Sequence, residues 1–220
     1  MNNKYSFHYK DKDYGFSACI FDFDGVIMDT EKYHFLAWQK ACESFEITLS
    51  EEEYLPLRST GRIKFAEYLE KKIGRSFTDA EKIQLFDCKQ QTFEKLSKNL
   101  SEKDLIEGIV PFLEKLAEKK VKTAVASSSS QSTILMEKHQ LNHYFTTILN
   151  GTVVAKKKPS PDIFLETAKR LNIPPQQCLV FEDSLVGVQA AVSAGMQVIV
   201  VGKLATKDAI FNIPDFTVLL

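Results

Sequence analysis

The sequence predicts an α/β protein with a Rossmann-like parallel sheet as its core and an inserted α-helical cap domain. Short β-branched, apolar segments alternate with helical segments over most of the chain, which is typical of βαβ units. This alternation stops between residues 31 and 104, where helical patterns occur without a convincing strand. We therefore expect residues 1–30 and 105–220 to form the core and residues 31–104 to form the cap.

The expected core strands are short and rich in apolar residues. They read SACIFDF (17–23), VKTAVA (121–126), TTILN (146–150), CLVFE (178–182) and QVIVV (197–201), and a short DFTVLL (215–220) ends the chain. Runs of this length and composition are typical of parallel strands that are buried on both faces. Residues 1–16 alternate only weakly, and they predict at most a short hairpin at an edge of the sheet.

The helical segments fall between these strands and throughout the insert. In the core they read PFLEKLAEKK (111–120), SPDIFLETAKRL (160–171) and SLVGVQAAVSAG (184–195), and in the insert they cover 31–45, 62–74 and 78–100. Thr78 and Glu81 have the spacing of a capping box, which predicts a helix start. Gly195 lies where a glycine ends a helix.

Composition excludes several classes of protein. Lys and Arg (28) nearly balance Asp and Glu (29), so nothing indicates nucleic-acid binding. No apolar run is long enough for a membrane span, and no secretory signal begins the sequence. The four cysteines are scattered, and Cys19 and Cys178 lie in apolar runs, which favours free core thiols and a cytoplasmic location. The sequence gives no clear signal of oligomeric state; the near-neutral charge allows a monomer, which we expect, and a dimer remains open.

Polar residues follow four of the expected strands, at the edge where ligands bind in open α/β sheets. They are Asp22 and Asp24, Ser127 to Ser130, Lys158, and Glu182 with Asp183. Each has an ordinary structural explanation when taken alone, such as a turn former or a solvated charge run. Residues 182–184, for example, could simply cap the next helix. Their joint occurrence at one sheet edge is what predicts a functional site.

The chemistry of these residues fits phosphoryl transfer. Converging carboxylates repel one another unless a cation joins them, and hard carboxylate oxygens suit Mg²⁺. One carboxylate can attack phosphorus, and a second can protonate the leaving oxygen and later activate water. Lysine and serine supply positive charge and hydrogen-bond donors for the phosphoryl oxygens. We therefore expect one of the two neighbouring aspartates to attack while the other moves protons.

These motifs resemble those of the haloacid dehalogenase superfamily of phosphotransferases. FDFDGV (21–26) is similar to its first motif, and Ser127, Lys158 and Glu182–Asp183 are similar to the second, third and fourth. The resemblance covers nearly all of the chain after residue 17. It implies that Asp22 is the nucleophile and Asp24 the general acid and base, and that Ser127 and Lys158 hold the phosphoryl group. It also implies Mg²⁺ bound by Asp22, the Asp24 carbonyl and Asp183, with Glu182 assisting.

The helical insert resembles the cap of the subgroup that contains β-phosphoglucomutase and many sugar-phosphate phosphatases. The stretch DTEKYHFLAW (29–38) carries this resemblance, and His34 and Trp38 share a helix face. The resemblance implies substrate-binding roles for His34, Arg62 and Lys89, although each could equally be a packing or solvated residue. Ser128 is a further candidate for substrate binding.

The resemblance implies a Mg²⁺-dependent phosphohydrolase that acts on a small phosphorylated metabolite, with a sugar phosphate preferred, through an aspartyl-phosphate intermediate. A β-phosphoglucomutase that interconverts β-glucose 1-phosphate and glucose 6-phosphate is the alternative. Residues 58–62 and Phe65 depart from the mutase pattern, which favours the phosphatase. A non-enzymatic phosphorylation-responsive module of the receiver type needs neither a second aspartate at Asp24 nor a large cap.

Overall fold

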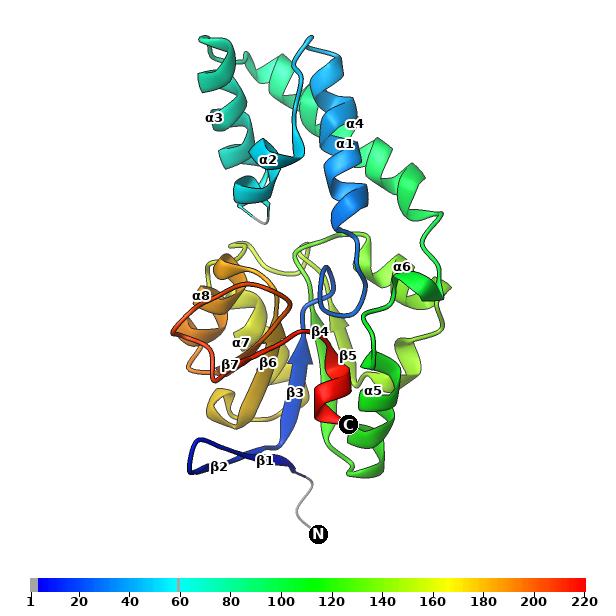
Figure 1. Cartoon of the computed structure of the whole chain (residues 1–220), viewed down its shortest axis with the longest axis vertical. Coiled ribbons are helices and arrows are strands. Elements are labelled where there is room, and N and C mark those ends of the chain that lie inside the picture. The colour runs from blue at the N-terminus through cyan, green and yellow to red at the C-terminus, as the bar shows by residue number, and fades with distance from the viewer. Residues whose placement is uncertain (1–3, 59) are drawn as a thin grey trace. The chain divides into compact units, whose positions relative to one another are not determined.

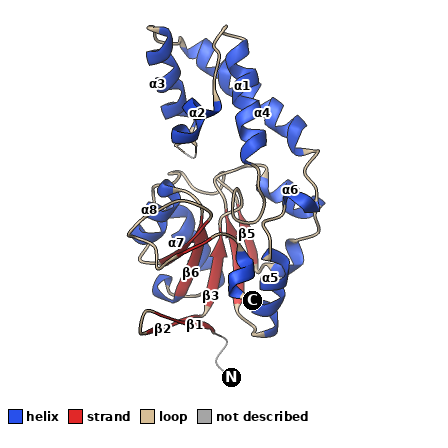
Figure 2. Ribbon diagram, in the orientation of Figure 1, coloured by secondary structure: helices blue, strands red, loops and turns tan. Residues whose placement is uncertain are grey.

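The computed structural model describes residues 4–58 and 60–220. The chain divides into two compact units: Met1–Asp29 with Ser101–Leu220, and Thr30–Leu100. We call the first the core unit and the second the helical unit. Figure 1 labels the α-helices and most strands of the two units, and Figure 2 shows that the sheet lies in the core unit.

A six-stranded parallel sheet in the order β5-β4-β3-β6-β7-β8 forms the centre of the core unit. Its strands are β3 (Ala18–Phe21), β4 (Lys122–Ala126), β5 (Thr147–Leu149), β6 (Cys178–Glu182), β7 (Gln197–Val201) and β8 (Asn212–Ile213). The helical segment α1–α4 is inserted after β3. The predicted fold class, α/β with a parallel sheet and a helical insert, is confirmed.

Alternate residues of the strands face opposite layers of helices, as the pleat of a strand requires. On one face, Ile20, Val180 and Val198 belong to a core cluster with residues of α7 and α8. On the other, the aromatic rings of Phe21 and Phe181 pack against Phe112 of α5. Because both faces are covered, the strands are almost entirely apolar. Cys19 and Cys178 are buried and free, as expected.

The core helices are α5 (Ile109–Glu118), α6 (Ser132–Lys138), α7 (Asp162–Leu171) and α8 (Leu185–Ser193), with 3₁₀ turns η2 (Glu102–Asp104), η3 (Asn142–Tyr144), η4 (Pro175–Gln177) and η5 (Phe216–Leu219). The predicted terminal strand at 215–220 is wrong, because η5 occupies this stretch and its Phe216 ring packs against Phe112. Sequence analysis also missed α6. Gly195 follows α8 with a φ of +76°, as its predicted place at a helix end requires.

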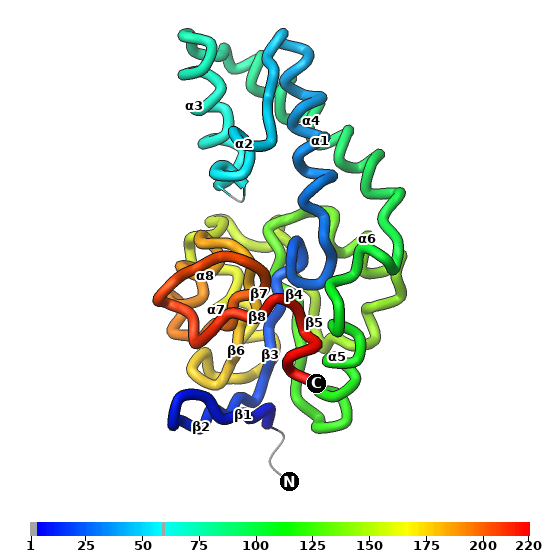
Figure 3. The backbone as a smooth tube through the Cα atoms, in the orientation of Figure 1, coloured from blue at the N-terminus to red at the C-terminus, as the bar shows by residue number. Residues whose placement is uncertain are grey.

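The N-terminal residues form an antiparallel hairpin, β1 (Tyr5–Tyr9) and β2 (Lys12–Phe16). The expected hairpin therefore exists, but it makes its own two-stranded sheet and does not extend the edge of the main one. The trace in Figure 3 places it at the start of β3, at the end of the sheet opposite the carboxyl ends of the strands. Its aromatic side chains pack on Phe112 and Phe211, which lie far away in the sequence.

The helical unit contains α1 (Glu31–Glu43), α2 (Glu51–Tyr54), α3 (Arg62–Ile73) and α4 (Asp79–Ser97), with the 3₁₀ turn η1 (Leu55–Leu57). Its core contains Trp38, whose ring stacks on Phe65 with centroids 3.9 Å apart. The predicted capping box of Thr78 and Glu81 is present at the start of α4. Across residues 4–58 and 60–220, no helix is both long and apolar enough to cross a membrane.

Candidate active site

The predicted site residues of the core unit follow four adjacent strands of the sheet. β5, β4, β3 and β6 are neighbours and run parallel, so their carboxyl ends form one edge. Asp22 comes directly after β3, and its backbone N–H donates to the carbonyl of Phe181 at 2.9 Å. This bond extends the pairing of β3 with β6 by one residue and sets Asp22 beside the end of β6.

The Lys158 ammonium ties three of these strand ends together. Its Nζ donates to Asp22 Oδ1 and to Glu182 Oε1, both at 2.6 Å, and to the carbonyl of Ala126 at 2.9 Å. Only 5% of the Lys158 side chain is exposed, so these bonds replace water almost completely. Charge-assisted bonds of this kind are strong, and they hold the two carboxylates on either side of one cation.

Glu182 is fully buried, and its second carboxylate oxygen is bound by the start of α8. Glu182 Oε2 accepts from the backbone N–H of Asp183 at 3.0 Å, from the backbone N–H of Ser184 at 3.1 Å and from the Ser184 hydroxyl at 3.0 Å. A Cβ at Gly187 would lie 1.9 Å from this carboxylate, so the carboxylate fills the space beside the glycine. Both oxygens of Glu182 are thereby held in fixed directions.

Three carboxylates of the site lie close enough to share a cation. Asp22, Glu182 and Asp183 each offer an oxygen, and these oxygens lie within 4.8 Å of one another. Gly25 leaves room for them, because a Cβ there would lie 2.4 Å from Asp183 Oδ2. An all-oxygen donor set suits a hard divalent cation such as Mg²⁺. The side chains of Asp22, Glu182 and Asp183 therefore fit a site for such a cation.

The electrostatics of the site also favour a cation. Burial is the largest influence on Asp22 and raises the pKa of its carboxyl to about 7, with Lys158 opposing the shift and Glu182 and Asp24 adding to it. Burial alone would lower the pKa of the Lys158 ammonium, but the charges of Asp22 and Glu182 outweigh this and raise it. Lys158 therefore stays positively charged. Its single positive charge is smaller than the combined negative charge that the surrounding carboxylates can carry.

The other predicted core residues lie at the same edge. Asp24 is partly buried and close enough to raise the pKa of Asp22. Ser127 is fully buried; its N–H donates to the carbonyl of Leu149, and its hydroxyl oxygen accepts from the N–H of Ser129 at 3.0 Å. Ser128 is exposed. A small turn after β4 therefore presents both serines at the end of that strand.

The three predicted substrate-binding residues of the helical unit lie on different helices. Lys89 Nζ on α4 is 3.0 Å from His34 Nδ1 on α1, and the imidazole of His34 stacks on Phe93 with centroids 4.0 Å apart. Because an ammonium can only donate, Nδ1 of His34 is the acceptor in this pair. Arg62, at the start of α3, is exposed, and its guanidinium lies over the Phe86 ring at 5.1 Å. Ser59, one of the residues at 58–62 that depart from the mutase pattern, lies outside the described residues.

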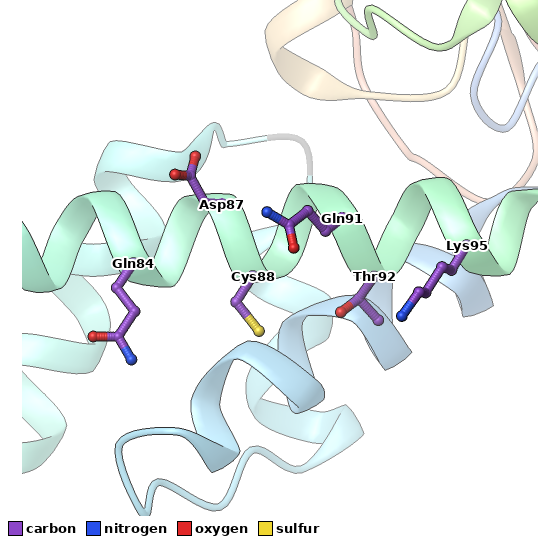
Figure 4. A pocket seen from close by; sticks show the side chains of 6 residues that line it. All are labelled: Gln84, Asp87, Cys88, Gln91, Thr92 and Lys95. Atoms are coloured by element: carbon purple, nitrogen blue, oxygen red, sulfur yellow. The ribbon is translucent and has the colours of Figure 1, made fainter.

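A groove of about 370 Å³ also lies along α4 in the helical unit. Figure 4 shows that its lining side chains come from successive turns of this one helix: Gln84, Asp87, Cys88, Gln91, Thr92 and Lys95. None of the predicted site residues lines it, and its acidic and basic side chains form no cluster like that around Lys158. We therefore assign the candidate active site to the sheet edge and not to this groove.

Sequence analysis missed two residues that shape the site, Ser184 and Gly187. The possible helix cap at residues 182–184 is present, because Ser184 caps α8 by accepting from the N–H of Gly187. The additional bond from the Ser184 hydroxyl to Glu182 has no signature in the sequence. For Gly187 a signal was available, since an isolated glycine inside a helical pattern often has a packing reason.

Comparison with known proteins agrees with this geometry. The family model for haloacid dehalogenase-like hydrolases matches residues 19–201. β-Phosphoglucomutase of Bacillus subtilis is 36% identical over 188 residues, which cover 84% of this chain and 83% of that protein. The phosphorylated carbohydrates phosphatase of Thermotoga maritima is 35% identical over 187 residues and 82% of each chain.

A solved structure shares the same fold. The crystal structure of β-phosphoglucomutase from Clostridium difficile superimposes with a TM-score of 0.84 at 27% identity, covering 93% of each chain. The enzymes most similar to this chain thus include both a mutase and a phosphatase. The chain belongs to the haloacid dehalogenase-like hydrolases, in the subgroup of β-phosphoglucomutase and the phosphorylated carbohydrate phosphatases, and is a phosphatase or phosphomutase.

Proposed function

We propose that this enzyme is a Mg²⁺-dependent phosphohydrolase that acts on a small sugar phosphate through an aspartyl-phosphate intermediate. The observation that carries the proposal is the buried Lys158 ammonium between Asp22 and Glu182, with Asp183 completing a set of three carboxylates. This arrangement combines a nucleophilic carboxylate, a positive charge for phosphoryl oxygens and a donor set for a divalent cation.

In the proposed reaction, a carboxylate oxygen of Asp22 attacks phosphorus while the bond from phosphorus to the sugar oxygen breaks. Asp24 gives its proton to the leaving oxygen, so the sugar departs as a neutral alcohol. Asp24 then takes a proton from water, whose oxygen attacks the aspartyl-phosphate. Inorganic phosphate leaves, and the Asp22 carboxylate is restored.

The remaining residues would bind and orient the phosphoryl group. Lys158 would donate to a phosphoryl oxygen, and Ser127 and Ser128 would supply hydroxyl donors at the end of β4. Asp22, Asp183 and the Asp24 carbonyl would hold Mg²⁺, with Glu182 assisting. When bound, the ion would neutralise carboxylate charge and polarise a phosphoryl oxygen.

We assign residues 31–104 to a cap and residues 1–30 with 105–220 to the catalytic core. His34, Arg62 and Lys89 would bind the part of the substrate that is remote from the transferred group. We also propose that the enzyme acts as a monomer in the cytoplasm, with a dimer as the alternative.

Release of inorganic phosphate from a panel of sugar phosphates, nucleotides and phosphorylated cofactors tests the function. We expect Mg²⁺-dependent hydrolysis of several sugar phosphates and its loss when the ion is chelated. No hydrolysis of any phosphate ester in the presence of Mg²⁺ would contradict the proposal.

A β-phosphoglucomutase is the second candidate, and the similarity to the Bacillus subtilis mutase favours it. Phe65 counts against it, because this position departs from the mutase pattern and the ring is buried against Trp38. Incubation with β-glucose 1-phosphate and a trace of the bisphosphate separates the two. Rapid formation of glucose 6-phosphate would reverse our order of preference.

Replacing Asp24 with alanine tests its role as acid and base. We expect Asp24→Ala to bind substrate nearly normally and to hydrolyse sugar phosphates more than about tenfold more slowly, which corresponds to about 1.4 kcal/mol of barrier. The defect should be smaller for an aryl phosphate, whose leaving group needs no proton. A rate within about tenfold of wild type on sugar phosphates would refute the assignment.

Replacing Arg62 with alanine tests the cap. Its guanidinium is exposed over Phe86, so its loss should leave the fold unchanged. We expect Arg62→Ala to raise KM for sugar phosphates by about tenfold or more and to leave hydrolysis of a small aryl phosphate unaffected. Arg75→Ala, which breaks a pair with Glu81 in the same unit, is the matched control. Equal losses on all substrates would indicate a structural role for Arg62.

A further inference from the structure

We propose that Ser184 is a positioning residue for the reaction: its hydroxyl orients Glu182, and Glu182 in turn holds Lys158 at Asp22. This inference rests on the proposed function for its kinetic consequences, but its geometry is independent of the substrate. Ser184 joins the start of α8 to the centre of the carboxylate cluster.

The Ser184 hydroxyl makes two bonds at once. It donates to Glu182 Oε2 at 3.0 Å, and its oxygen accepts from the backbone N–H of Gly187 at 3.2 Å. Because a hydroxyl has a single proton, Ser184 donates that proton to Glu182, and a lone pair of its oxygen accepts from the N–H of Gly187. One side chain thus caps α8 and fixes the direction of a buried carboxylate.

The direction of Glu182 matters because its two oxygens have different partners. Oε2 faces the start of α8, and Oε1 accepts from Lys158 Nζ at 2.6 Å. Rotation of the carboxylate would break both sets of bonds together. The absence of a side chain at Gly187 is equally necessary, since any Cβ there would overlap the carboxylate.

A chain of bonds therefore runs from Ser184 through Glu182 and Lys158 to Asp22, and almost all of it is buried. Only 9% of Ser184 is exposed and Glu182 is fully buried, so water cannot readily replace a lost hydroxyl. Misplacement of reacting groups by about 1 Å can cost on the order of 100-fold in rate. The structure thus indicates a role for Ser184 beyond capping the start of α8.

Two substitutions separate positioning from capping. Alanine removes both the cap and the bond to Glu182, whereas glycine is nearly as good a cap as serine and removes only the bond. We expect Ser184→Ala and Ser184→Gly to lower kcat alike, by about tenfold, with KM little changed. Ser184→Thr keeps a hydroxyl and should restore most of the rate. Ser50→Ala, which removes the N-cap of α2 in the other unit, should leave kcat unchanged.

Binding of Mg²⁺ without substrate provides a second measurement. Since Glu182 belongs to the carboxylate cluster, titration calorimetry with MgCl₂ should show several-fold weaker binding to the Ala and Gly variants and wild-type binding to Ser50→Ala. Should Ser184→Ala fail to fold, Ser184→Gly and Ser184→Thr still decide the matter. Wild-type kcat and Mg²⁺ affinity in Ser184→Gly would overturn the inference. A wild-type protein that hydrolyses nothing would refute the proposed function, and the Mg²⁺ comparison would still test Ser184.

Discussion

Asp22→Asn is expected to abolish turnover while the fold survives. An amide of nearly the same shape replaces the carboxylate, so packing after β3 changes little. It has no anionic oxygen to attack phosphorus, and Glu182, which also bonds Lys158, is held by the start of α8. We expect kcat to fall by at least about 10³-fold, or about 4 kcal/mol of barrier.

The intermediate gives a direct measurement. Acid-quenched wild-type protein should carry a phosphoryl group by intact mass, and Asp22→Asn should carry none. Circular dichroism and thermal unfolding should show the variant folded, because it removes one of several crowded carboxylates. Asp208→Asn makes the same chemical change at an exposed position and should behave as wild type. Phosphorylation of Asp22→Asn, or more than about one-hundredth of the wild-type kcat, would remove Asp22 as the nucleophile.

The parallel sheet was largely predictable because the pattern of its strands is local, whereas the order of the strands was not predicted. Strands buried on both faces are continuous apolar runs, and polar residues directly after them mark the carboxyl edge. Asp22, Lys158 and Glu182 could be grouped in this way before any contact was known. Their grouping follows from the parallel arrangement of four neighbouring strands.

Features that depend on distant partners were less predictable. DFTVLL has the composition of a strand, but the Phe216 ring packs on Phe112 and the segment forms a 3₁₀ turn. The hairpin at 5–16 makes a sheet of its own, and its aromatic residues pack on Phe112 and Phe211. The direction of the Ser184 hydroxyl likewise depends on a buried carboxylate. In the sequence, capping of α8 already explains Ser184, so nothing indicates that its hydroxyl also bonds Glu182.

Lys158→Met is expected to reduce both activity and folding stability. Methionine fills a similar volume but leaves Asp22 and Glu182 buried without a cation. Removing one partner of a buried ion pair costs about 3–5 kcal/mol, since the remaining charge keeps its desolvation penalty. Lys40→Met is the matched control: Lys40 lies 2.6 Å from Glu43 but is 63% exposed, and its loss should cost little stability.

The pH dependence of folding stability and a second substitution show whether the loss in Lys158→Met comes from the missing charge. The carboxyl of Asp22 has a higher pKa in the folded state than in the unfolded state, so the folded state binds its proton more tightly. The free energy of unfolding therefore falls as pH rises from the unfolded-state pKa through the folded-state pKa. Without Lys158 that pKa should rise further. We therefore expect urea unfolding in the presence of a chelator to show a larger loss in Lys158→Met at about pH 8 than at about pH 5. Adding Glu182→Gln should recover stability without recovering turnover. A loss that is independent of pH and unchanged by Glu182→Gln would mean that Lys158 contributes through packing rather than through its charge.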